Sequence, residues 1–272
     1  MRHLALLIVL VLMTAASVAA QTPAVVNGTL EAHTIAGSLE REFDTITKRV
    51  TGPAWIGYAV PVPARGHDSG CWSGDGPYAT RLAGPLKLEG PDSLFVLYRI
   101  ADRRIDRIRV ASSECPLDAG GLTVYWLTGV TSGGSLDWLA KSISADSTRR
   151  LESSAMTAIA LHGEPATDRL IAFARESQDP RVRADALFWL GQRAGDKAAG
   201  TISDAIDRDP DTEVKKKAVF ALSLMPKDEG VPKLIDLARS NRNAAVRRQA
   251  MFWLGQSGDP RALRFFEEVL RK

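Results

Sequence analysis

The sequence feature that most constrains the fold is a repeat of 32 residues in the second half of the chain. Residues 182–191 (VRADALFWLG) and 246–255 (VRRQAMFWLG) are identical at seven of ten positions, and residues 214–223 (VKKKAVFALS) lie midway between them. A period of this length accommodates one pair of helices, and each pair buries its apolar face only by stacking on its neighbours. The sequence therefore predicts an array of helix pairs, which provides surface rather than a reaction centre.

Two alternating classes of helix are predicted over residues 133–272. The first class carries an apolar stripe at Val182, Ala186 and Leu190, with equivalents 32 residues later, and Trp189 falls within the same arc. The second class extends back to a copy at Leu139, which makes about four and a half helix pairs. Breaks are predicted at Gly163-Glu164-Pro165, Asp179-Pro180, Gly195, Asp209-Pro210, Pro226 and Asp259-Pro260.

The last helix is expected to bury its apolar residues and to present a polar far side, as a terminal cap does. The residues expected in the core are Leu263, Phe266, Val269 and Leu270.

The string from Asp179 to Gly191 reads Asp-Pro-x-Val-Arg-x-x-Ala-x-x-x-Leu-Gly and resembles the HEAT-like repeats of the phycobilisome-lyase type. This resemblance covers about 135 residues. It implies a right-handed α-solenoid that serves as a protein-binding scaffold, with the first helix class on its concave side. It does not imply bilin lyase activity, because the first half is unrelated. The strings PAWIGYAVPV and CPLDAGGL carry a weaker resemblance to exported bacterial HEAT-repeat proteins.

The first 20 residues are typical of a bacterial signal peptide. Arg2 gives a basic start, residues 4–13 are apolar, and Val18-Ala19-Ala20 is a small-residue cleavage site. The alternative is an uncleaved N-terminal anchor. After cleavage no stretch approaches 18 uninterrupted apolar residues, so no stable membrane span is expected. The chain is therefore predicted to be periplasmic or secreted.

Residues 21–132 are predicted to form a β-rich module with one short helix that begins after Ser38. Strands are expected at 55–62 and 121–130, and residues 93–100 and 104–112 form a hairpin with a bulge between Ile105 and Ile108. The predicted fold is thus an α+β protein of two domains, a β-rich module followed by an α-solenoid.

The chain has two cysteines, Cys71 and Cys115, which in an exported protein predict a disulfide. Such a bond would close a loop of about 45 residues and contribute roughly 3–4 kcal/mol. The alternative is a metal site that adds His67 as a ligand, but three ligands without a second pair do not make a zinc motif. No metal is predicted.

Catalytic candidates in the first half are few. Asp118, in the string Cys115–Gly121, is either a base or metal ligand or a residue that bonds its own turn. His67 and Asp68 could pair with a nucleophile, either Ser69 or Ser73, although a triad is recognised by geometry and not by composition. Three tryptophans, interpreted as core residues or as a ligand platform, are Trp55, Trp72 and Trp126. No catalytic residue and no cofactor is predicted.

The candidate partner-binding surface is a ladder of Phe188, Phe220 and Phe252, which a helical wheel places opposite the core stripe. Cations flank this ladder and suit a peptide or an acidic protein surface, whereas the alternative is that the rings fill gaps between stacked repeats. The flanking cations are Lys216, Lys217 and Arg248. A second basic column, Arg183, Lys215 and Arg247, is expected to bond loop carboxylates such as Asp179 and Asp211.

These features favour an exported, non-enzymatic scaffold that binds another protein or peptide in the cell envelope. A formal net charge of +3 gives no argument for nucleic acid. The alternative is an enzymatic or ligand-binding N-terminal domain with a deep pocket near His67, Cys71 and Asp118.

Overall fold

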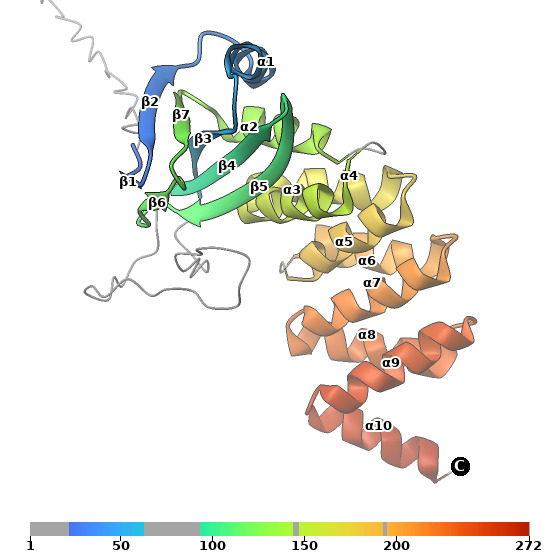
Figure 1. The fold of residues 1–272 in the computed structure, drawn as a ribbon. Coiled ribbons are helices and arrows are strands. Elements are labelled where there is room, and N and C mark those ends of the chain that lie inside the picture. The colour runs from blue at the N-terminus through green and yellow to red at the C-terminus, as the bar shows by residue number, and fades with distance from the viewer. Residues whose placement is uncertain (1–21, 63–92, 144–146, 193–194, 272) are drawn as a thin grey trace, which may run out of the picture.

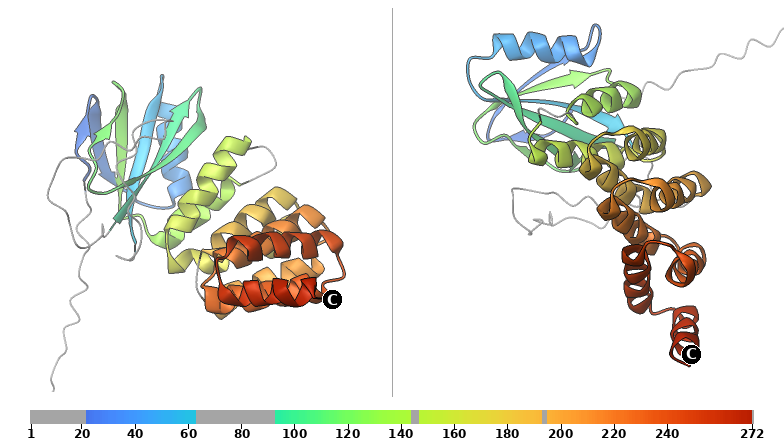
Figure 2. Two further views of the ribbon diagram at one scale, coloured as in Figure 1. Left: turned by 90° about the horizontal axis from the view of Figure 1, so that it is seen from below. Right: turned by 90° about the vertical axis from the view of Figure 1, so that its right-hand side faces the viewer.

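The computed structural model describes residues 22–62, 93–143, 147–192 and 195–271. A β-sheet forms the N-terminal part, and an array of helices extends from it to the C-terminus (Figure 1). Two further views show the helices stacked in successive pairs, with the last pair farthest from the sheet (Figure 2). The predicted combination of a sheet-containing region and a helical repeat region is confirmed.

The described strands are β1 (Val25–Val26), β2 (Thr29–Thr34), β3 (Ala54–Pro61), β4 (Ser93–Ala101), β5 (Arg104–Ser112), β6 (Leu117–Asp118) and β7 (Thr123–Thr128). Five of them form one sheet in the order β2-β7-β3-β4-β5, and β1 pairs with β6 in a second, two-stranded sheet. The neighbours β3, β4 and β5 are antiparallel, whereas β7 runs parallel to both β2 and β3. The main sheet is therefore mixed.

The predicted hairpin and its bulge are confirmed. Strands β4 and β5 pair in antiparallel register around a turn at Asp102 and Arg103, both with positive φ. The register shifts after Arg99, which pairs with Arg107, because Ile100 pairs with Ile105 and Asp106 is the extra residue.

Sequence analysis identifies no strand before Ser38, yet β1 and β2 lie there. The partner of β2 is β7, and the hydroxyls of Thr29 and Thr123 hydrogen-bond at 2.9 Å across this pair. Four of the six residues of β2 are exposed and its only apolar residues are Leu30 and Ala32, neither of them buried, so the apolar signal of the strand is weak. Its position depends on pairing with a strand about ninety residues later.

The predicted short helix is α1 (Leu39–Arg49). Its N-cap is Ser38, whose hydroxyl accepts a hydrogen bond from the backbone N–H of Arg41. The apolar stripe of α1 is buried: Phe43 packs edge-on against Tyr98 of β4, with ring centroids 4.8 Å apart. The helix therefore covers one face of the sheet.

The helices that follow are α2 (Ser132–Lys141), α3 (Arg149–Leu161), α4 (Thr167–Glu176), α5 (Pro180–Gly191), α6 (Asp196–Arg208), α7 (Thr212–Leu224), α8 (Lys227–Ser240), α9 (Ala244–Gln256) and α10 (Pro260–Leu270). A short 3-10 helix (Glu164–Ala166) precedes α4. The first class comprises α3, α5, α7 and α9, and the second comprises the others. The described helices thus form one single helix followed by four pairs.

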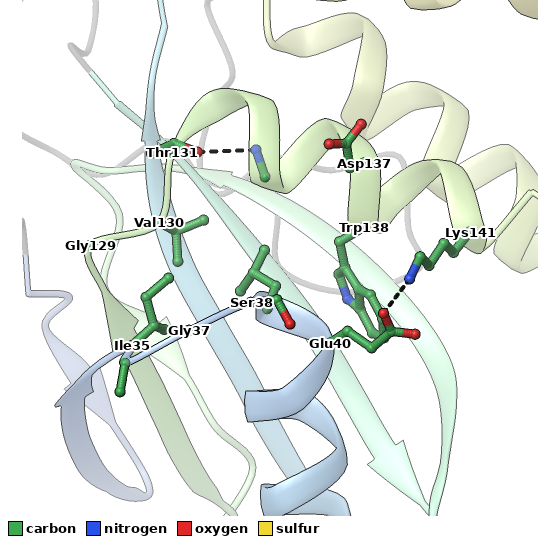
Figure 3. A pocket seen from close by; sticks show the side chains of 13 residues that line it. Ile35, Gly37, Ser38, Glu40, Gly129, Val130, Thr131, Asp137, Trp138 and Lys141 are labelled. Atoms are coloured by element: carbon green, nitrogen blue, oxygen red, sulfur yellow. Dashed lines mark hydrogen bonds and ion pairs between the residues drawn. The ribbon is translucent and has the colours of Figure 1, made fainter.

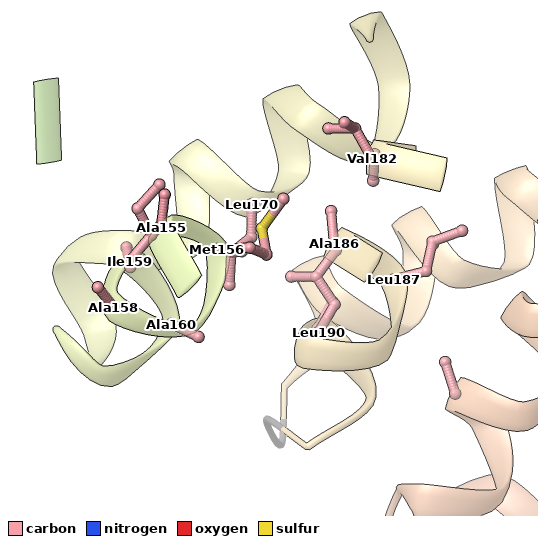
Figure 4. Packing of buried hydrophobic residues seen from close by; sticks show 14 of the residues in the cluster. Ala155, Met156, Ala158, Ile159, Ala160, Leu170, Val182, Ala186, Leu187 and Leu190 are labelled. Atoms are coloured by element: carbon pink, nitrogen blue, oxygen red, sulfur yellow. The ribbon is translucent and has the colours of Figure 1, made fainter. Parts of the chain in front are cut away.

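The repeat core has the predicted stripe, with Val182, Ala186 and Leu190 buried on α5 (Figure 4). Trp189, expected in the same arc, is only half-buried. Leu187 is fully buried although it lies outside the stripe. The reason is that α5 packs against α7 as well as against α4 and α6, so that it is covered on more than one side.

Helices of the first class approach one another closely. The pairs α5–α7 and α7–α9 make more extensive contact than any consecutive members of the second class, which places these three helices on the inner side of the array; α3 and α5 make less contact. Gly191 permits this approach, because a methyl group there would lie 2.5 Å from the carbonyl oxygen of Ala221 on α7.

The prediction for the last helix is wrong in part. Leu263, Val269 and Leu270 are exposed by 63%, 46% and 85%, and the buried residues of α10 are Ala262 and Phe265. The periodicity predicts which positions a further repeat would bury, but no further helix covers this side of α10 in the described part of the chain.

The sheet and the repeats share one apolar core. Helices α1 and α2 and the first repeat helix α3 pack on the same face of the sheet, and buried side chains continue from there to α10. The predicted domain boundary lies beside the first residue of α2, Ser132, but the core does not divide there. The opposite face carries a separate cluster that includes Phe95 and Trp126 and is flanked by half-buried Trp55.

Cys115 is buried, 5% exposed, and is not a free thiol. Cys71 lies outside the described residues, as do His67, Asp68, Ser69, Trp72 and Ser73. The predicted Cys71–Cys115 disulfide therefore stays a prediction.

Candidate partner-binding surface

The predicted phenylalanine ladder is part of a longer chain of aromatic rings along the inner helices. Phe188 on α5 stacks on Phe220 of α7, with centroids 6.0 Å apart and planes at 21°. Phe220 in turn stacks on Trp253 of α9 at 4.6 Å. Edge-on contacts extend the chain at both ends, with Trp189 beside Phe188 and Phe252 beside Trp253.

The ring order differs from the predicted column, because Phe220 contacts Trp253 and Phe252 lies beyond it. Trp189 and Trp253 are repeat-equivalent, but the middle repeat has Ala221 at this position. This alternation in side-chain size was visible in the sequence, although its consequence for the stacking order depends on helix packing.

Exposure separates the three phenylalanines. Phe188 and Phe220 are half-buried, and each stacks on a ring of the next repeat, as rings that fill gaps between repeats do. Phe252 has no following repeat in the described chain and is 54% exposed. A large exposed aromatic ring on a helix is the kind of residue that anchors a protein interface. Among the ladder residues, Phe252 is therefore the one accessible to a partner.

The cations beside the ladder also differ from one another. Lys216 is one helical turn before Phe220 and forms an ion pair with Glu213 at 2.8 Å, which offsets its charge. Lys217 and Arg248 are exposed, and Arg248 lies one turn before Phe252 on α9. The accessible part of the surface thus combines one aromatic ring with a guanidinium.

The second basic column bonds across the joints between helices, but mostly to backbone carbonyls. Lys215 donates to the carbonyls of Ile206 and Asp207 at 2.9 and 2.7 Å, and Arg247 donates to that of Asn241 at 2.6 Å. These carbonyls lie at the C-terminal ends of α6 and α8, where a cation is favourable.

Within the described ranges, Arg183 is the one member of this column that pairs with a carboxylate, and the partner is Asp209 rather than the predicted Asp179 or Asp211. Its Nε and Nη2 donate to the two Asp209 oxygens at 2.7 and 3.0 Å. Both side chains are buried, exposed by 10% and 5%. Burial raises the pKa of Asp209, but the hydrogen bonds from Arg183 and from the backbone N–H of Asp211, together with the positive charges of Arg183 and Lys215, outweigh burial, and the pKa is lowered.

A buried polar chain joins the sheet to the first helices. The Tyr98 and Tyr58 hydroxyls are 2.8 Å apart, and Ser135 Oγ lies 2.8 Å from both Tyr58 Oη and His162 Nε2. His162 Nδ1 is 2.7 Å from the carbonyl oxygen of Ala158. Because a carbonyl only accepts, Nδ1 carries the proton and Nε2 accepts from Ser135.

The Ser135–His162 contact has the length of a nucleophile–base pair, but both residues are 0% exposed, so no substrate reaches them. Burial lowers the pKa of His162, which keeps the ring neutral near pH 7. These hydrogen-bonded side chains are therefore a structural connection from β3 and β4 to α2 and α3. No local sequence pattern predicts these hydrogen bonds, because Tyr98 and Ser135 lie 40 and 77 residues after Tyr58, and His162 lies 27 residues after Ser135.

A cleft of about 480 Å³ lies between the start of α1 and helix α2 (Figure 3). Trp138 forms part of its wall, and Lys141 forms an ion pair with Glu40 at its rim. The hydroxyls of Ser38 and Thr131 each cap a helix. The cleft offers an indole face and compensated charges, and its described lining holds no histidine or cysteine.

The predicted N-terminal pocket is not reproduced by the described residues. Asp118 bonds its own turn, accepting from the backbone N–H of Gly120 at 2.9 Å and from Asn27 Nδ2 at 3.2 Å. Its proposed neighbours His67 and Cys71 lie outside the description. Within the described ranges no group of three or more His, Cys, Asp or Glu side chains is placed to hold a metal ion. No described helix is long and apolar enough to cross a membrane.

Comparisons with known proteins agree with the helical architecture. A family model of HEAT repeats matches residues 167–241 and again 200–272, from α4 to the end of α10. No curated protein sequence matches the chain. A solved structure of the complex of CpcE and CpcF of phycocyanin lyase from Nostoc sp. PCC7120 is similar at 16% identity and a TM-score of 0.42, over 52% of this chain and 91% of that one. The family match shows that residues 167–272 are HEAT-like, as the sequence predicts.

Proposed function

We propose that this chain is a non-enzymatic scaffold that binds another protein through the inner surface of its repeats, with Phe252 as the central contact. The observation that carries the proposal is that Phe252 is 54% exposed. Its ring lies at the end of the series of stacked aromatic rings, beside Trp253, which is itself held by Phe220. An anchor on stacked helices is preorganised, because its neighbours are fixed before the partner arrives.

The partner's chemistry follows from the residues around the anchor. Arg248 lies one turn from Phe252, and Lys217 is exposed on the neighbouring helix of the same class. An apolar side chain flanked by carboxylates would complement this combination. The partner is therefore proposed to be an acidic protein surface or peptide rather than a nucleic acid.

The test is affinity capture from an envelope extract of the producing cells, with three single variants compared. Phe252→Ala and Arg248→Glu are each expected to lower the amount of captured partner by at least about tenfold, as substitutions of hot-spot residues do. Lys197→Glu, on the opposite helix class with a side chain 76% exposed, is the matched charge control and retains the partner. Equal capture by the wild type and Phe252→Ala contradicts the proposal.

The proposed site of action is the bacterial periplasm or exterior, with residues 1–20 removed and Cys71 paired with Cys115. The sequence of the first 20 residues and the pair of cysteines support this. Non-reducing mass spectrometry of the native protein tests both points: an N-terminus near Gln21 and no alkylatable thiol are expected. A retained leader or two free thiols would overturn them.

A further inference from the structure

Exposed apolar side chains gather at the far end of the repeat array. Seven large apolar side chains are exposed in the described residues, and five of these belong to the last pair of helices. Two of the five, Met251 and Phe252, are on α9, and the three on α10 include Leu263 and Leu270. Apolar surface concentrated in this way marks an interaction site more often than chance exposure.

The repeat itself identifies what kind of surface this is. The residue 32 positions before Leu263 is Val231, 3% exposed, and the one before Leu270 is Ala238, also 3% exposed. On the inner helices, Met251 corresponds to Val219, which is fully buried. In earlier repeats these positions are covered by the following repeat. The exposed patch is therefore a stacking face without its neighbour.

The other end of the array has no such face. The first helices, α2 and α3, pack against strands β3 and β5, so the sheet covers the surface that a preceding repeat would occupy (Figure 1). Among the described residues, a second copy of the chain therefore offers a matching helical face only at its own α10. Contact between identical faces produces a closed two-fold dimer and not a filament.

The charges of α10 suit contact with an antiparallel copy of itself. Arg261 and Glu268 already pair within the chain, with Asp259 and Arg239. Arg264 and Glu267 are exposed, and neither has an ion-pair partner among the described residues. These two free charges have opposite signs and lie on either side of the middle of the helix.

We propose that this face binds a second copy of the chain, α10 against α10, around a two-fold axis near Phe266. Leu263 of each copy then lies beside Leu270 of the other, and Arg264 lies near Glu267. The contact is distinct from the proposed partner-binding surface, which is centred on Phe252 of the inner helix.

The test is sedimentation analysis of the purified protein by analytical ultracentrifugation over a concentration series. The wild type is expected to show a monomer–dimer equilibrium. Leu263→Glu and Leu270→Glu each bury a charge at the interface and should weaken self-association on the order of 100-fold. Val26→Glu is the matched control, since Val26 is also an exposed apolar residue, at 48%, but lies in β1. A monomeric wild type, or a dimer that only Val26→Glu disrupts, overturns the proposal.

Charge reversal tests the orientation. Arg264→Glu and Glu267→Arg are each expected to weaken the dimer, and the double variant should restore it because each copy then carries both reversed partners. Failure of the double variant to recover contradicts the antiparallel arrangement. Phe252→Ala is expected to leave the monomer–dimer equilibrium measured by ultracentrifugation unchanged. Loss of partner capture and loss of the dimer are therefore separable results.

Discussion

The two ends of the helical array present the same kind of surface in opposite states. At the first end, α2 and α3 lie under a β-sheet and are tied to it by the hydrogen-bonded chain from Tyr98 to His162. At the last end, α9 and α10 expose Met251, Leu263 and Leu270 at positions that earlier repeats bury. A HEAT-like pair cannot bury its own stacking face, so each end of the array needs a cover.

The difference shows how a binding role can arise from a repeat without any catalytic residue. The sheet closes one end through the hydrogen-bonded chain from Tyr98 to His162, which ties its position to particular partners. The open end and the adjacent Phe252 have only exposed apolar atoms and charges, which suit an intermolecular contact. Stability is expected to depend on the joints within the chain, and binding on the end that is not covered.

The largest effect is expected at the joint in the middle of the array. Arg183→Ala leaves the Asp209 carboxylate buried without its cation and should lower the free energy of unfolding by about 3–5 kcal/mol. Chemical denaturation measures it. The control is Arg181→Ala on the same helix, whose ion pair with Asp179 is exposed and whose loss should not be detectable. Similar losses for both variants would show that burial of the Arg183 pair is unimportant.

The next effect tests the covered end. Ser135→Ala removes the hydrogen bonds to both Tyr58 and His162. Tyr58 keeps its hydrogen bond to Tyr98, but the buried Nε2 of His162 is left unsatisfied, which costs roughly 1–3 kcal/mol. Ser132→Ala, on the same helix but not fully buried, serves as the control in the same denaturation experiment. A neutral Ser135→Ala would mean that the polar chain does not hold the sheet on the helices.

The covered end is also expected to be sensitive to acid. The pKa of His162 is lowered by burial in the folded state, so the unfolded chain binds the proton more readily. The stability that this group contributes is present above about pH 6.5 and is lost as the pH falls from there toward its lowered folded value. Denaturation midpoints at pH 7.5 and 5.0 measure the loss, and His162→Gln should reduce it. The same pH dependence in His162→Gln would exclude His162 as the cause.

The smallest effect is expected at the open end. Leu270 is 85% exposed, so Leu270→Ala should change the stability of the monomer by no more than about 0.5 kcal/mol. Thermal unfolding at a concentration well below that of self-association measures this. A large loss would mean that Leu270 is packed within the chain, and the comparison of the two ends would fail.

What the sequence predicted well depends on local signals. The cap at Ser38, the Asp-Pro starts at Asp179 and Asp259, and the bulge in the β4–β5 hairpin each follow from neighbouring residues. The core stripe of α5 followed from the period in the same way.

The remaining features depend on residues that are distant in sequence. The pairing of β2 with β7 and the meeting of Ser135 with His162 have no local signature. Phe220 and Phe252 are equivalent in the repeat, yet only Phe252 is largely exposed, because exposure depends on whether a neighbour follows. The same reason accounts for the exposure of Leu263 and Leu270, which periodicity alone assigns to the core.

The most direct test of the scaffold role is site-specific photocrosslinking in the producing cells. A photoreactive amino acid replaces Phe252 in one variant and Lys197, on the opposite helix class, in another. The account predicts a discrete adduct with one other protein from position 252 and none from position 197, identified by mass spectrometry. No adduct at 252, or the same adducts from both positions, would contradict it.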